Sequence, residues 1–327
     1  MGNALDLGPV ATRGSAFRAR AEARQREYRT EVLGVGWSRY GHILDEQAAA
    51  AGRNFILSQS HHAARDRASR GKGVADRTFN NMLSSQAMCF NVFAPLADDL
   101  DLAYEVLQPF LPGLRAVHNI NFEYTPPNDV FGDQTGLGGV DCDLLVEAEL
   151  QDGAGAVVTI ETKFVEPEFS ICGFRRPGRK AKGQPVCPDG VPVRANPRAC
   201  LYEFRKGYRY WEQTLRLRTL APGALPEVSC PFGGPEWQLW VNHTLAHAEA
   251  ERRGANHAVF AVCAPTANHA LLGAGVLDSF LARLARPETF RFIPLEGLIA
   301  QIETAVARRE AQLRPWGAGL TRRYAGI

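Results

Sequence analysis

The chain has 327 residues, of which 45% are hydrophobic and 22% charged, enough for one large or two ordinary domains with a sizeable core. Lys and Arg number 37 against 35 Asp and Glu, and a net charge of +2 points to no particular partner. No apolar run approaches the ~18 residues needed to cross a bilayer, which excludes a membrane-spanning protein. The Arg-rich first thirty residues lack an apolar segment, so we expect no secretory signal and, with seven cysteines, a reducing cytoplasmic location.

Helical spacing of apolar residues dominates the N-terminal third. It predicts helices at residues 15–33, 45–51, 80–96 and 101–110. The first of these is rich in Arg and Glu and should be exposed and basic, and the third should stop at Pro95. His61 and His62 lie in a polar stretch that a loop explains. We therefore expect residues 1–76 to form an N-terminal helical extension.

The period then changes to the alternation of strands. Residues 117–124 alternate and end at Pro126, and two further strands are predicted at 140–149 and 157–165. Asp152-Gly153 between the last two is a hairpin signal. The order is therefore helices followed by a three-stranded meander.

The remainder mixes irregular segments with helices. Residues 167–200 are proline-rich, 257–263 resemble a buried strand, and helices are predicted at 199–220, 236–253, 273–286 and 296–310. We predict an α/β domain over residues 77–310, with a mixed central sheet flanked by helices, and a C-terminal tail over residues 311–327.

Acidic residues on two neighbouring strands are the candidate for chemistry. Glu161 and Lys163 point to one face of their strand, and Asp141 or Asp143 on the preceding strand can lie beside them. Converging carboxylates repel each other unless a cation lies between them, and Mg²⁺ suits oxygen ligands and phosphate. The alternative is a ladder of surface ion pairs on a half-exposed sheet.

Several motifs, in this order, resemble the PD-(D/E)xK nuclease superfamily, and more closely a bacterial family of putative restriction endonucleases. They are Ser84-Ser85-Gln86-Ala87…Phe90-Asn91, Gly139-Val140-Asp141, Thr159-Ile160-Glu161-Thr162-Lys163-Phe164, Tyr210-Trp211 and Gln238-Leu239…Asn242. The resemblance implies a restriction-endonuclease-like core and a DNA endonuclease that depends on Mg²⁺ or Mn²⁺. Asp141, Glu161 and the carbonyl of Thr162 would be metal ligands, and Lys163 would position the attacking water.

The chain departs from the family pattern in two places. Val140 stands where the family name has proline, and Gln86 stands where an additional acid often occurs, which weakens the case for a second metal. Asp141 and Asp143 share a strand face, so parity cannot choose between them, although the family pattern favours Asp141. The alternative functions are a non-catalytic nucleic-acid-binding protein that keeps the fold and a cysteine metal-cluster protein. A homodimer is compatible with either reading.

Four cysteines and five cations fall in or beside the irregular region. Cys172, Cys187, Cys200 and Cys230 are 15, 13 and 30 residues apart, and because no C-x₂-C pair occurs we expect free thiols, with zinc or an iron–sulfur cluster as the alternative. Cys142 and Cys263 are predicted core residues. The cations that could contact DNA phosphates are Arg175, Arg176, Arg179, Lys180 and Lys182, although a solvated loop explains them equally well.

Other possible sites are weaker. Tyr208, Tyr210 and Trp211 could stack on bases, but packing of a helix is favoured. His243 and His247 are one helical turn apart, yet Thr244 stands where a zinc protease needs glutamate. The chain has no nucleophile elbow, P-loop or dinucleotide-binding glycine motif.

Overall fold

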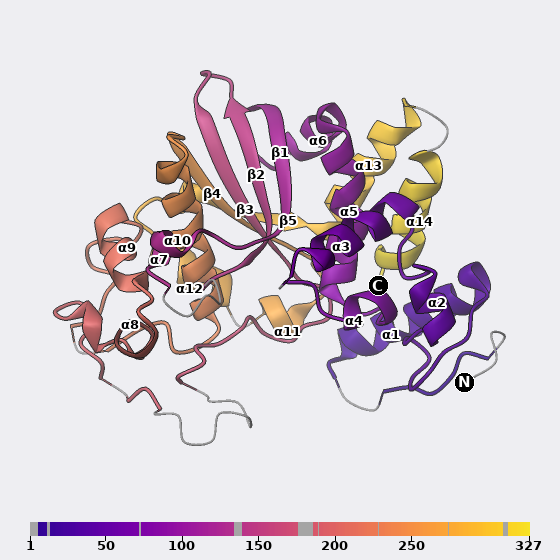
Figure 1. The fold of residues 1–327 in the computed structure, drawn as a ribbon, viewed down its shortest axis with the longest axis horizontal. Coiled ribbons are helices and arrows are strands. Elements are labelled where there is room, and N and C mark those ends of the chain that lie inside the picture. The colour runs from indigo at the N-terminus through magenta and orange to yellow at the C-terminus, as the bar shows by residue number, and fades with distance from the viewer. Residues whose placement is uncertain are drawn as a thin grey trace.

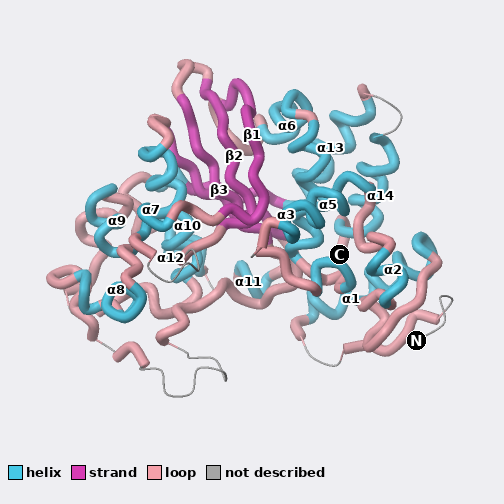
Figure 2. Tube along the Cα trace, viewed as in Figure 1, coloured by secondary structure: helices cyan, strands magenta, loops and turns pink. Residues whose placement is uncertain are grey.

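A five-stranded mixed sheet lies at the centre of the fold, in the order β1-β2-β3-β4-β5 (Figures 1 and 2). The strands are β1 Leu114–Tyr124, β2 Cys142–Leu150, β3 Gly155–Thr162, β4 His257–Ala264 and β5 Phe290–Pro294. The computed structural model describes residues 6–11, 14–71, 73–133, 139–175, 186–188, 190–227, 229–273, 275–309 and 313–327. β1, β2 and β3 pair antiparallel, whereas β4 and β5 continue the sheet in parallel.

Helices cover both faces of this sheet (Figure 1). α10 contacts β3 and β4 on one face, while α5, α6 and α13 contact β1, β3 and β5 on the other. The N-terminal part contains α1 Ala16–Tyr28, the π-helix η1 Arg29–Leu33, α2 Glu46–Ala50, α3 Ser58–Ser69, α4 Arg77–Asn80, α5 Ser85–Asp98, α6 Leu100–Leu107 and α7 Asn128–Phe131. The C-terminal part contains η2 Pro197–Ala199, α8 Leu201–Lys206, α9 Tyr210–Leu217, α10 Glu236–Arg252, α11 His269–Leu272, α12 Val276–Leu281, η3 Pro287–Thr289, α13 Leu295–Ala307 and α14 Arg314–Tyr324.

The predicted α/β class and the helix-then-meander order are confirmed. The turn between β2 and β3 contains Gly153 at φ +79°, the left-handed conformation that the Asp152-Gly153 pair predicted. Alternation then divides the sheet between two cores. Leu144 of β2 and Ile160 of β3 are buried against α5 and α13, whereas Leu145 is buried on the α10 side.

The N-terminal helix is present, but the expectation that it is exposed was wrong. Its buried face includes Phe17 and Gln25, and the following π-helix begins with the fully buried Arg29. The Arg29 guanidinium donates to the carbonyls of Asp6, Val35 and Gly41, so its charge is buried with hydrogen-bond acceptors. Composition alone cannot reveal this arrangement, because the acceptors are backbone atoms of distant loops.

α5 continues through Pro95 to Asp98, so the predicted stop at this proline was also wrong. A proline inside a helix leaves the carbonyl four residues earlier without its usual donor. Here that carbonyl belongs to Asn91, and the indole Nε1 of Trp316 in α14 donates to it at 2.7 Å. α14 therefore replaces the hydrogen bond that Pro95 removes.

Several elements differ from the prediction. His61 and His62 lie in α3, and β5 and α14 had not been expected. The predicted helix 199–220 is divided into α8 and α9 at Gly207, which has φ +74°. The division of the chain at residues 76 and 310 stays a prediction. No helix in the described ranges is long and apolar enough to span a membrane.

Candidate active site

Two acidic residues lie side by side where β2 and β3 reach the same edge of the sheet. Leu144 of β2 pairs with Ile160 of β3, and antiparallel register brings the next residues, Asp143 and Glu161, opposite each other. The Glu161 side chain projects from the face that α10 covers, where Gln238 and Asn242 contact it.

Glu161 is held by three donors. Its Oε1 accepts hydrogen bonds from Gln238 Nε2 at 2.6 Å and from Lys163 Nζ at 2.8 Å, and its Oε2 accepts one from Asn242 Nδ2 at 2.8 Å. Gln238 and Asn242 are one turn apart on α10, so they face the sheet together. Glu161 is 5% exposed and Lys163 7%, so their ion pair is largely shielded from solvent.

Asp143 is anchored to the neighbouring strand. Its Oδ2 accepts hydrogen bonds of 2.6 Å from both the backbone N–H and the hydroxyl of Thr162. Burial and then repulsion by Glu161 raise the pKa of Asp143 to about 7, although Lys163 and Thr162 act in the opposite direction. As a residue, Asp143 is partly exposed.

Lys163 follows β3 directly, and its backbone N–H donates to the carbonyl of Cys263 in β4 at 2.9 Å. Burial lowers the pKa of Lys163, but the carboxylates of Glu161, Glu166 and Asp143 raise it to a net value above the ordinary one. The amine is therefore a buried ammonium ion at neutral pH.

A third carboxylate, Glu123 of β1, was not expected. The β1 residues on either side of Glu123 pair with the β2 residues on either side of Asp143. Glu123, Asp143 and Glu161 are therefore aligned across β1, β2 and β3. Its backbone adopts φ +48°, and Arg67 donates to its carbonyl at 2.7 Å. The sequence signal was an acid near the end of the first strand of the predicted meander, but the pattern does not fix which residue of the next strand lies opposite it.

Glu123 lies in an environment that disfavours its charge. Its side chain is buried, and its Oε1 has no hydrogen-bond partner among the residues that the structure describes. Burial and then repulsion by Asp143 raise the pKa of Glu123 to about 9, with a hydrogen bond from Gln86 acting against the shift. Gln86 is fixed in turn, since its Nε2 donates to Gly73 O at 2.7 Å.

Asp141, which the family pattern favoured, lies in a different setting. Its side chain is exposed, and its Oδ1 accepts a 2.6 Å hydrogen bond from the hydroxyl of Thr125. The charged groups with the largest effect on the pKa of Asp143 are Glu161 and Lys163. The geometry thus joins Asp143 to Glu161 and Lys163 and places Asp141 beside Thr125.

The N-terminus of α5 closes the other side of the site. Ser85 Oγ donates to Glu166 Oε1 at 2.7 Å, and Glu166 Oε2 accepts the backbone N–H of Phe164 at 2.8 Å. Asn268 Nδ2 donates to the carbonyls of Phe164 and Glu166 at 3.0 and 2.9 Å. These contacts fix the segment that carries Lys163.

The carboxylate oxygens of the site suit a divalent cation. Three neighbouring carboxylates offer hard oxygen ligands. The raised pKa values of Glu123 and Asp143 and the unpartnered Oε1 of Glu123 indicate that positive charge would stabilise the group. Within the described ranges, no three His, Cys, Asp or Glu side chains are gathered as the ligands of a single metal ion. The fit therefore rests on the chemistry and charge of the carboxylates.

The other predicted sites have mixed outcomes. Arg176, Arg179, Lys180 and Lys182 lie outside the described residues, and Arg175 donates from Nη1 to Cys187 O at 3.0 Å. The core positions are confirmed for the buried residues Cys142, Cys263, Tyr208, Tyr210 and Trp211.

The two histidines of α10 are buried in the core. His243 Nε2 lies 2.8 Å from Thr289 Oγ1, and His247 Nδ1 lies 3.3 Å from Arg286 Nη2. Burial lowers the pKa of His243 far below the ordinary value and that of His247 to about 4. Both imidazoles are therefore neutral structural side chains at physiological pH.

Comparison with known proteins adds one finding. Neither the curated proteins nor the solved structures contain a match to this chain. A family model described as the PD-(D/E)XK nuclease superfamily matches residues 12–178 and 232–326, which span the sheet, the flanking helices and all three carboxylates. The chain therefore belongs to the PD-(D/E)XK nuclease superfamily.

Proposed function

We propose that the protein is a metal-dependent DNA endonuclease that hydrolyses phosphodiester bonds in the cytoplasm. The observation that carries this proposal is the side-by-side position of Asp143 and Glu161 on paired strands, with the Lys163 ammonium 2.8 Å from Glu161. Membership of a nuclease superfamily supports the same conclusion.

Asp143 and Glu161 would hold Mg²⁺ or Mn²⁺, with the backbone carbonyl of Thr162 as a further ligand. We assign the role of metal ligand to Asp143 and not to Asp141, because Asp143 interacts with Glu161. When bound, the cation supplies positive charge that stabilises the phosphate in the transition state and acidifies water.

Lys163 has two tasks in this proposal. Its ammonium donates to Glu161 and keeps two donors available for a water molecule or a phosphate oxygen. It orients the attacking water towards phosphorus and offsets negative charge that develops on the phosphate. The bond between Lys163 N and Cys263 O keeps the backbone in place for both tasks.

Substrate binding would use charge outside this site. The cluster Arg175, Arg176, Arg179, Lys180 and Lys182 follows the strand that carries Glu161, and cations there would bind the DNA backbone in a salt-dependent way. Cleavage and binding are thus assigned to separate groups of residues.

Nicking of plasmid and single-stranded DNA with Mg²⁺ or Mn²⁺ tests the proposal. Glu161→Gln keeps the size and shape of the side chain but removes the charge and replaces one acceptor oxygen with a donor NH2, so it should abolish cleavage and leave DNA binding intact. Glu149→Gln alters a half-buried glutamate at the far end of β2 that also pairs with a cation, Arg115 at 2.8 Å; it is the matched control and should cleave like wild type. Equal cleavage by Glu161→Gln and wild type would refute the assigned site, and binding without cleavage by any variant would favour the non-catalytic alternative.

A further inference from the structure

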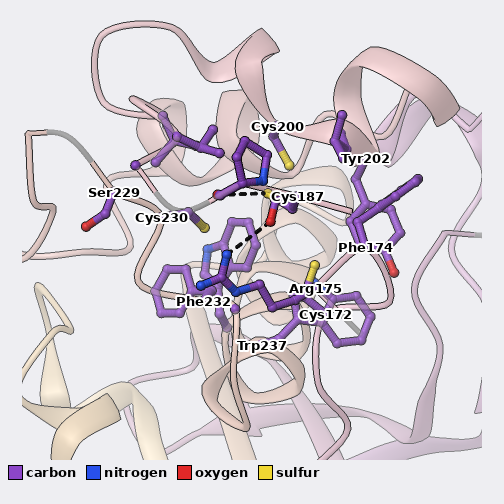
Figure 3. Close-up of a pocket in the computed structure, with 17 residues that line it drawn as sticks. Cys172, Phe174, Arg175, Cys187, Cys200, Tyr202, Ser229, Cys230, Phe232 and Trp237 are labelled. Carbon is purple, nitrogen blue, oxygen red and sulfur yellow. Dashed lines mark hydrogen bonds between the residues drawn. The ribbon is translucent and has the colours of Figure 1, made fainter. Parts of the chain in front are cut away.

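Four cysteine side chains line a single cavity of about 100 Å³ next to α8 and α10 (Figure 3). They are Cys172, Cys187, Cys200 and Cys230, which come from four separate stretches of the irregular region. All four are free and partly exposed, whereas the other three cysteines, Cys89, Cys142 and Cys263, are buried elsewhere in the core. The fold thus gathers in one place thiols that are up to 58 residues apart, from Cys172 to Cys230.

The rest of the cavity lining is mostly apolar and aromatic, including Phe174, Tyr202, Phe232 and Trp237. Tyr202 stacks on Trp237 with ring centroids 5.6 Å apart, which makes this wall a packed surface. A hydrophobic cavity with sulfur as its main ligand-type atom suits a soft, thiophilic metal centre and does not suit Mg²⁺.

Backbone N–H groups are directed at three of the four sulfurs. They come from residues two or three positions further along the chain, namely Phe174 and Arg175 for Cys172, Tyr202 and Glu203 for Cys200, and Phe232 for Cys230. Burial raises the pKa of each thiol, and these hydrogen bonds act against it. Hydrogen bonds to sulfur stabilise thiolates and are a usual second shell of cysteine-ligated metals.

A positive charge accompanies the thiols. Arg175 lines the cavity, and its charge favours the thiolate forms of Cys172 and Cys187. Its side chain also donates to the carbonyl of Cys187 at 3.0 Å, which holds the guanidinium at the cavity wall (Figure 3). A tetrathiolate centre carries net negative charge, so a cation beside it is a compensating feature.

Three of the four cysteines lie outside the matched family model. The model matches up to residue 178 and again from residue 232, so Cys187, Cys200 and Cys230 lie in the unmatched segment 179–231, here called the insertion, while Cys172 lies in the matched domain. Within the described residues the insertion contains only the short elements η2, α8 and α9. An irregular insertion with little core of its own is the kind of segment that a metal centre stabilises.

We propose that Cys172, Cys187, Cys200 and Cys230 form a tetrathiolate site for a thiophilic metal centre, a zinc ion or an iron–sulfur cluster, that fastens the insertion to the nuclease domain. As described, no three of these thiols share the position of one ion. Zinc would draw the sulfurs in to about 2.3 Å from the metal, whereas a cluster bridges a wider gap with its own iron and sulfide. The site is separate from the carboxylates and does not depend on the proposed nuclease activity.

Metal and sulfide analysis of the full chain, produced and purified without oxygen in medium with zinc and iron, tests the proposal. Either about one zinc ion per chain without sulfide, or iron with an equal amount of acid-labile sulfide, supports it and identifies the centre. Cys200→Ser and Cys230→Ser should each lose most of that metal, and Cys263→Ala, which alters a cysteine of the sheet core, should keep it.

Counting reactive thiols in the unaltered protein guards against variants that fail to fold. Chelation, or oxidative destruction of a cluster followed by reduction, should expose about four additional thiols as the metal is released. Wild type without bound metal, metal retained by both serine variants, or disulfides between these cysteines in the anaerobic protein would each overturn the proposal.

Discussion

Asn242 of α10 donates a 2.8 Å hydrogen bond to Oε2 of Glu161 in β3, and so connects the helix that covers the sheet to the candidate metal ligand. Gln238, one turn earlier, donates to Oε1 of the same carboxylate at 2.6 Å. The two amides fix both oxygens of Glu161. They are positioning residues, because they act on the reaction through Glu161.

Asn242→Ala should therefore weaken the metal site without removing a ligand. Loss of an outer hydrogen bond to a metal ligand typically costs about 10–100-fold in metal affinity or activity. We expect DNA cleavage by this variant to need more Mg²⁺ for half-maximal rate. Gln151→Ala, which removes an exposed amide from a turn, is the control. An unchanged Mg²⁺ dependence of Asn242→Ala would show that Glu161 needs no such support.

Lys163→Met should lower the stability of the fold as well as the cleavage rate. It removes the ammonium that lies 2.8 Å from Glu161 and leaves a buried carboxylate with only the two amides as donors. Breaking a buried pair in this way costs about 3–5 kcal/mol of unfolding free energy. Urea unfolding should show that Glu161→Gln, added to Lys163→Met, recovers part of this loss. A double variant less stable than Lys163→Met would contradict the account.

The raised carboxyl pKa values predict an unusual pH dependence in EDTA. The pKa is about 7 for Asp143, against an ordinary 3.8, and about 9 for Glu123, against 4.5. At a pH between the ordinary and the raised pKa of each group, the folded state binds more protons than the unfolded state. The unfolding free energy therefore falls as pH rises through this range. We expect Tm to decrease from about pH 6.5 to about pH 8.5, where the histidines of α10 are already neutral.

Glu123→Gln should make this decrease shallower, because it removes the group with the highest carboxyl pKa. Mg²⁺ should raise Tm more at the upper end of the range, where the carboxylates are ionised. Thermal unfolding by circular dichroism at several pH values provides both measurements. A Tm that stays level or rises in EDTA, with the same slope for Glu123→Gln, would argue against repulsion among these carboxylates.

The hydrogen bond from Trp316 to Asn91 predicts that Pro95→Ala reduces the loss of stability caused by Trp316→Phe. Trp316→Phe leaves the carbonyl of Asn91 buried without a donor, which should cost about 1–3 kcal/mol in addition to any loss of packing. Pro95→Ala restores an N–H that can donate to that carbonyl within α5. Urea unfolding should therefore show a smaller effect of Trp316→Phe in the Pro95→Ala background than in wild type. Equal effects in the two backgrounds would mean that the indole does not substitute for the missing helix bond.

Local patterns were sufficient to predict the meander and the pair Glu161 and Lys163, because both follow from alternation along strands and a short hairpin. The choice between Asp141 and Asp143 was not accessible, since the two residues share parity and differ only in which neighbours they meet. Predicting the position of Glu123 beside Asp143 requires the register between β1 and β2, which is a relation between separate segments of the chain. The convergence of four cysteines on one cavity depended on the path of an irregular chain, which has no periodicity to interpret.

The contacts between the N-terminal and C-terminal helices illustrate a second limit of prediction from sequence. The Arg-rich α1 has the composition of a solvated helix, yet Gln25 Nε2 donates to the backbone carbonyl of Arg323 in α14 at 2.8 Å. Arg323 is itself fully buried; its Nε donates to Gln25 Oε1 at 2.7 Å and its Nη2 donates to Asn54 Oδ1. Such charged residues are buried because polar groups from remote segments satisfy them, and no window of sequence contains both partners.

The most direct test compares Asp143 of β2 with Asp141, which immediately precedes this strand, in the same cleavage assay. Asp143→Asn and Asp141→Asn change the same chemical group two residues apart, so differences in expression or charge between them should be small. With supercoiled plasmid and Mg²⁺, we predict loss of cleavage for Asp143→Asn and near wild-type cleavage for Asp141→Asn. Loss of cleavage for Asp141→Asn, with Asp143→Asn fully active, would contradict the assignment of Asp143, Glu161 and Lys163 as the catalytic site.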